Sequence, residues 1–65
     1  MNTIKAVYTN NFEIILSEVQ TLFELDYVVS YKRSEDPDYK TSEHIKDFRM
    51  ADFMFNSKLQ ELEGN

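Results

Sequence analysis

The sequence predicts a small α+β domain in which one amphipathic helix covers a three-stranded sheet, in the order β-α-β-β. Three segments predict this fold: an alternating stretch at residues 4–9, apolar residues at helical spacing over 11–25, and a β-branched and aromatic run at 27–32. A chain of 65 residues has room for one domain, residues 1–65. We expect a stability of about a few kcal/mol for so short a chain.

The first strand and the helix are predicted from two different periods. From Ile4 to Thr9, successive side chains alternate between two faces, as in a strand. Asn10 is then followed three residues later by Glu13, the arrangement of a helical capping box. On a helix from about Asn11 to Leu25, the apolar side chains share one stripe: Phe12, Ile15, Leu16, Val19, Leu22 and Phe23. We expect this stripe to pack on the sheet.

A second strand is predicted from Tyr27 to Lys32, where β-branched and aromatic residues predominate. A strand, a helix and a second strand connect most simply as a right-handed parallel unit. The segment from Ser34 to Asp38 is predicted to be a loop, because Pro37 has a fixed backbone angle and disfavours helical geometry at the preceding residue.

The C-terminal third fits two structures. The preferred one is a strand from Phe48 to Asn56, followed by a short helical tail from Ser57 to Glu63 that ends near Gly64. The alternative is one long helix with a single apolar stripe, formed by Ile45, Phe48, Ala51, Phe55, Leu59 and Leu62. In that alternative, three apolar side chains lie off the stripe and contact water or a partner: Met50, Phe53 and Met54.

Composition argues against catalysis and against cofactors. The chain has no cysteine, one histidine and one glycine, so disulfides, thiolate zinc sites and glycine-rich phosphate loops are excluded. His44 has Ser42 and Asp47 nearby in sequence, but on one short charged segment rather than on the separate rigid elements that hold a triad. Asp36 and Asp38 do not begin a calcium loop, because the glycine that its sixth position requires is missing. We expect no enzyme, no metal and no cofactor.

Charge restricts the class of partner. The net charge is −5, and residues 34–65 carry eight of the twelve acidic groups. An acidic surface repels phosphate backbones and anionic lipids, so we expect no direct binding to nucleic acid or to membranes. A larger protein with a basic surface is the expected partner. No apolar run resembles a signal peptide or a membrane span, which predicts a cytoplasmic location.

The order of the predicted elements resembles a group of short proteins. The strand Ile4–Thr9, the helix after it, the Tyr-Val-Val-Ser-Tyr strand at residues 27–31 and the aromatic-rich strand that follows resemble short β-α-β-β proteins from prophage and sporulation loci of Gram-positive bacteria. The resemblance covers residues 3–56 and is one of order and length. It implies a phage-type accessory protein and identifies no functional residue.

The functional prediction is a small acidic module that binds a larger host protein as an inhibitor or regulator. Six residues are predicted to contact this partner, three acidic and three apolar: Glu35, Asp36, Asp38, Met50, Phe53 and Met54. A structural homodimer is the alternative, with Val7 and Val28 on a sheet face that the helix leaves uncovered. Mimicry of nucleic acid is a further alternative, weakened by four interspersed cations: Lys40, Lys46, Arg49 and Lys58.

Overall fold

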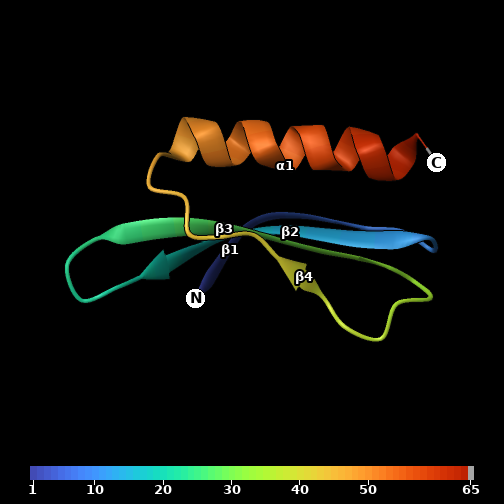
Figure 1. Cartoon of the computed structure of the whole chain (residues 1–65), viewed down its shortest axis with the longest axis horizontal. Coiled ribbons are helices and arrows are strands. Elements are labelled where there is room, and N and C mark those ends of the chain that lie inside the picture. Colours follow the sequence, from blue (N-terminus) through green and yellow to red (C-terminus); the bar gives the residue numbers. More distant parts are fainter. Residues whose placement is uncertain (65) are drawn as a thin grey trace.

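A computed structural model describes residues 1–64 as four strands followed by one helix. The elements are β1 (Asn2–Tyr8), β2 (Phe12–Gln20), β3 (Leu25–Arg33), β4 (Lys40–Thr41) and α1 (Phe48–Glu63). The strands form one antiparallel sheet in the order β1-β2-β3-β4, and α1 lies across one face of it (Figure 1). The fold class is α+β, as predicted.

The predicted helix from Asn11 to Leu25 is wrong, because this segment forms β2, a turn and the start of β3. Phe12, Ile14 and Leu16 alternate along β2 and are buried beneath α1. Ile15, Ser17 and Val19 occupy the other face of the same strand. Because both faces carry apolar residues, the segment also satisfies a helical stripe. Its β-branched Ile14, Ile15 and Val19 favour the strand.

Each of the two long hairpins is closed by a threonine. In the first turn, the Thr9 backbone N–H donates to the Phe12 carbonyl at 2.9 Å, and the Thr9 hydroxyl accepts the Phe12 N–H at 3.0 Å. In the second turn, the Thr21 backbone N–H donates to the Glu24 carbonyl at 2.8 Å, and the Thr21 hydroxyl accepts the Glu24 N–H at 3.1 Å. Asn10 therefore lies in a two-residue hairpin loop and does not cap a helix. With hairpins in place of a crossover helix, the predicted parallel pairing is also wrong and the sheet is antiparallel.

The predicted strands at 4–9 and 27–32 correspond to β1 and β3, and the Ser34–Asp38 loop is present between β3 and β4. The sheet has four strands rather than the predicted three: the sequence predicts β1 and β3 but not the central β2 or the short outer β4, and the third predicted strand is part of α1.

The C-terminal third contains one helix, so the strand predicted from Phe48 to Asn56 is wrong and the alternative of a long helix is confirmed. Ile45, which that alternative placed on the helical stripe, lies before the helix and pairs with Tyr27 instead. The Asp47 carboxylate begins α1 by accepting the Met50 N–H at 3.0 Å. Ala51, Phe55 and Leu62 are buried against the sheet. One buried stripe and a capping side chain therefore outweigh the strand preference of the phenylalanines. Gly64 follows the helix as its C-cap.

The hydrophobic core lies between α1 and the face of the sheet formed by β2 and β3. The prediction that Val7 faces away from the helix is wrong, because Val7 packs against this core. The reason is that the helix comes from the C-terminus and covers the face of β1 that bears Lys5 and Val7. Val28 lies on the opposite face, as predicted, but only 3% of it is exposed.

Candidate functional site

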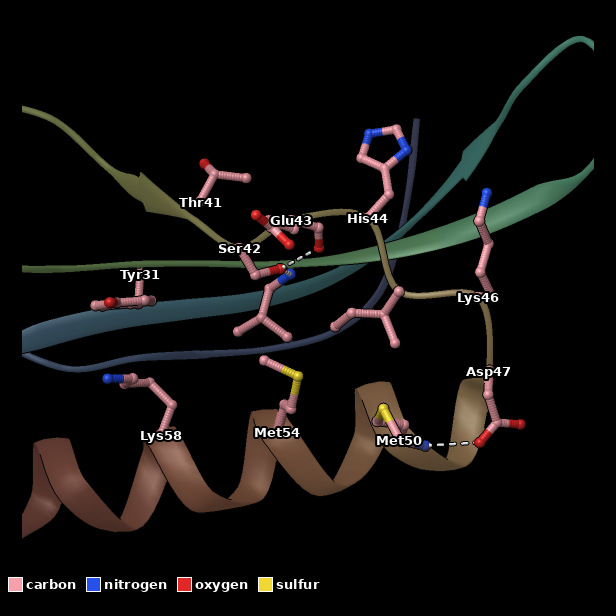
Figure 2. A pocket seen from close by; sticks show the side chains of 12 residues that line it. Tyr31, Thr41, Ser42, Glu43, His44, Lys46, Asp47, Met50, Met54 and Lys58 are labelled. Atoms are coloured by element: carbon pink, nitrogen blue, oxygen red, sulfur yellow. Dashed lines mark hydrogen bonds between the residues drawn. The ribbon is translucent and has the colours of Figure 1, made fainter.

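A groove of about 690 Å³ runs between α1 and the β4 edge of the sheet. It exists because α1 packs on β2 and β3 and does not reach across β4. Its floor includes Val29 and Ile45, which are buried, and Tyr31. Figure 2 shows Met50, Met54 and Lys58 of α1 on one side, facing the Thr41–Glu43 segment on the other. The groove is lined mainly by apolar atoms and has charged residues at its rim.

The predicted apolar contact residues form one exposed patch on α1. Met50, Phe53 and Met54 are 59%, 70% and 39% exposed. Spacings of three and four residues place them next to one another on the helix surface. Met50 and Met54 line the groove, whereas Phe53 lies on the side of α1 opposite the buried Ala51. The structure therefore brings together the apolar half of the predicted contact set.

The predicted acidic contact residues lie elsewhere, in the loop between β3 and β4. Figure 1 shows this loop at the end of the sheet away from the start of α1, so the acids and the methionines do not form one site. Asp36 stabilises the loop, since its carboxylate accepts the Arg33 N–H at 3.2 Å and its carbonyl accepts from Lys32. Glu35 and Asp38 are exposed.

A second polar cluster surrounds Asp26, which is buried on the sheet face opposite α1. Its Oδ2 lies 2.8 Å from Nδ1 of His44. Its Oδ1 receives no hydrogen bond within residues 1–64, but Nζ of Lys46 lies 3.2 Å from it and balances its charge. The hydrogen bond with His44 lowers the pKa of Asp26; burial opposes this shift, and Lys46 adds to it. Figure 2 shows His44 and Lys46 directed away from α1.

Lysines at the two ends of the groove are neutralised within the molecule. Lys46 lies 2.6 Å from the Glu24 carboxylate, whose hydrogen bond raises the pKa of Lys46. Lys58 lies 3.2 Å from Glu61 and 4.6 Å from the centre of the Tyr31 ring. Burial disfavours the charged form of Lys58, but the contacts with Glu61 and Tyr31 outweigh it and raise its pKa.

The residues considered for catalysis are not arranged as a triad. His44 Nδ1 is bound to Asp26, the Ser42 hydroxyl donates to the Glu43 carbonyl at 2.9 Å, and the Asp47 carboxylate caps α1. Among residues 1–64, no three His, Asp or Glu side chains are placed to hold a metal ion.

Sequence reasoning missed the sheet-edge half of the groove and the Asp26 cluster. Ile45 is the only apolar residue between Tyr39 and Phe48, and this isolation could have indicated a buried contact. It pairs with Tyr27 through two backbone hydrogen bonds of 2.8 Å and so extends the edge beyond β4. Asp26 gave no comparable indication, because its partners are 18 and 20 residues away.

The chain matches no protein-family model, and comparison with curated proteins and with solved structures finds no relative. In the part of the chain that the structure describes, no helix combines the length and the hydropathy needed to cross a membrane.

Proposed function

We propose that this chain is a non-enzymatic protein-binding module whose binding surface is the methionine groove, meaning the groove together with Met50, Phe53 and Met54. The observation that carries the proposal is the exposure of these three side chains beside a groove with a buried apolar floor. Large exposed apolar groups that adjoin one another favour a protein interface over a solvated surface.

The chemistry of the patch supports this proposal. Methionine is flexible and polarisable, so it adapts to the shape of a partner. Phe53 supplies the aromatic group that often dominates binding energy at interfaces. None of the three is needed for the core, whose α1 members are Ala51, Phe55 and Leu62. A role in binding accounts for apolar residues that folding does not require.

The partner that we propose is a larger protein with a basic surface, on which this module acts as an inhibitor or regulator in the cytoplasm. The net charge of −5 supports a basic partner over nucleic acid or an anionic membrane. A phage-type accessory role is compatible with this proposal. The resemblance that suggested it rests on a β-α-β-β order, whereas the helix of this chain follows all four strands.

A homodimer built on Val7 and Val28 is less favoured by the packing. Val7 contacts the core beneath α1, and Val28 is 3% exposed. Neither side chain offers the exposed apolar area that a dimer interface requires.

The test compares three tagged baits in a native lysate: the unmodified protein, a Met50→Glu/Met54→Glu variant and a Tyr8→Glu control. Tyr8 is 64% exposed on β1, away from the groove. Circular dichroism first establishes that all three are folded. We expect the unmodified protein and the control to retain the same partner and the groove variant to lose it. Identical retention by all three baits would exclude the methionine groove as the binding surface.

A further inference from the structure

We infer that the methionine groove binds an extended peptide segment, which adds to the sheet as a fifth strand beside β4 and carries alternating apolar side chains and one basic side chain. This inference rests on the proposed function and specifies the conformation and chemistry of the segment that is bound. Three features of the structure support it: the open sheet edge, the dimensions of the groove and the distribution of its charges.

The sheet edge beside the groove is open to another strand. β4 is an outer strand, and the chain continues along β3 until Ile45 pairs with Tyr27. Between these points, the Ser42 N–H donates to the Val29 carbonyl, so the N–H of the next residue, Glu43, points away from β3 and donates to no acceptor within residues 1–64. Glu43 is exposed. Unpaired backbone groups on an outer strand are a template for strand addition.

The groove lies where an added strand would project its side chains. Successive residues of a strand point to opposite faces, so every second side chain of the segment would enter the space between the edge and α1. Met50 and Lys58 mark the ends of the groove along the helix. Eight residues of helix span about 12 Å, which an extended segment covers in about four residues. The groove therefore accepts about two inward-facing side chains, and Met54 lies between their positions.

The charges at the rim favour a basic residue in the segment. Each lysine that lines the groove already has an acidic partner: Lys46 pairs with Glu24 and Lys58 with Glu61. The carboxylate of Glu43 contacts no cation within residues 1–64. Among the charged residues that line the groove, those without a partner of opposite charge are therefore acidic, whereas Lys40 of β4 lies outside the lining. A lysine or arginine of the segment would complement the Glu43 carboxylate.

The experiment selects short random peptides displayed on phage against the unmodified protein, with Met50→Glu/Met54→Glu as the counter-selection. We expect enriched peptides to place apolar residues at alternate positions and to contain a lysine or arginine. The strongest peptide is then synthesised, and its affinity and its effect on amide hydrogen exchange are measured. Binding should slow exchange at the Glu43 amide.

Backbone methylation of that peptide provides the sharper test. Only every second amide of an added strand faces the sheet edge. N-methylation of one alternating set should weaken binding by about tenfold or more, and methylation of the other set should have little effect. In the protein, Glu43→Gln should weaken binding by about two- to fivefold and remove the preference for a basic residue.

Several results would overturn this inference. Apolar residues spaced by three and four in the enriched peptides would indicate a bound helix, and a methylation scan without alternation would exclude strand addition. Enrichment of acidic peptides, or no enrichment at all, would also overturn it. So would a groove occupied by a second copy of the chain, which would be detected as a dimer that the Met54→Glu substitution dissociates. Loss of the partner from the groove-variant bait would still support the proposed function in each of these cases, so the two proposals fail separately.

Discussion

Asp26 shows how a single buried charge is stabilised in so small a protein. Asp26 is 1% exposed, and two side chains from the segment between β4 and α1 contact its carboxylate: His44 forms a hydrogen bond with it, and Lys46 balances its charge. Lys46 also pairs with Glu24 at the end of the second hairpin. One buried carboxylate therefore connects β3, the hairpin and the segment that leads into α1. Removing Lys46 would leave the buried carboxylate without the cation that balances its charge.

Asp26 should make the stability of the protein fall at acidic pH. Its pKa in the folded state lies below the ordinary value of 3.8, so its stabilising contribution is complete above that value and is lost as the pH falls through the folded-state pKa. We expect Asp26→Asn to destabilise the protein at neutral pH and to have a smaller effect at about pH 3. Denaturant titration at both pH values measures this difference.

The matched control is Asp38→Asn, which changes an exposed carboxylate without a partner in the described part of the chain. Its effect should be small at both pH values. An Asp26→Asn effect that stays constant over this pH range would show that Asp26 does not stabilise the fold through its charge.

At the scale of elements, the second strand determines the whole fold. β2 pairs with both β1 and β3, and its Ile14 and Leu16 are fully buried. Had residues 11–25 formed a helix, β1 and β3 would have been free to pair in parallel. A strand with apolar groups on both faces brings them into an antiparallel meander instead, and the core face is left for α1.

Core substitutions distinguish the strand from the helix that the sequence suggested. Ile14→Ala should lower the free energy of unfolding by about 2–4 kcal/mol, because it opens a cavity beneath α1. Leu22→Ala should have little effect, since Leu22 is 86% exposed at the hairpin turn. Denaturant titrations of both variants provide the measurement. A large effect of Leu22→Ala with a small effect of Ile14→Ala would support the helical arrangement over the observed one.

The start of α1 is a second element that can be tested. Asp47→Ala removes the carboxylate that accepts the Met50 N–H and should cost about 1 kcal/mol. Asp52 is the comparison on the same helix, since it pairs with Lys5 on β1. Asp52→Ala should cost less, because exposed ion pairs contribute little. Thermal melting followed by circular dichroism gives both values, and equal melting temperatures for Asp47→Ala and the unmodified protein would contradict the capping role.

The sequence allowed β1, β3 and the acidic loop to be predicted, because their patterns fit one structure only. It did not allow β2 to be predicted, because the Ile14-Ile15-Leu16 run satisfies both a strand and a helical stripe. Pairing with β1 and β3 stabilises the strand over the helix, and a local sequence pattern does not show such contacts with other strands. For the same reason, Met50, Phe53 and Met54 could be identified as surplus apolar residues, whereas the sheet edge that faces the two methionines depends on Ile45 pairing with Tyr27.

At the scale of the whole molecule, apolar and acidic surfaces are separated. The methionine groove lies on the α1 side of the sheet, whereas the loop that bears Glu35 and Asp38 curves away from α1 (Figure 1). A partner that fills the groove need not touch this loop. The loop can still act over a distance, since exposed charges interact over about 8 Å at physiological ionic strength.

Glu35 and Asp38 should therefore affect the rate of association more than the lifetime of the complex. For a basic partner, Glu35→Gln/Asp38→Asn should reduce the on-rate by about two- to fivefold at low salt and have less effect at high salt. Asp36 is left unchanged because it holds the loop through the Arg33 N–H. Met54→Ala should instead raise the off-rate by about fivefold or more, because it removes apolar contact at the groove. Surface plasmon resonance at several salt concentrations separates the two rates. An on-rate that is indifferent to both salt and the double substitution would mean that the acidic loop plays no part in recognition and that the groove alone selects the partner.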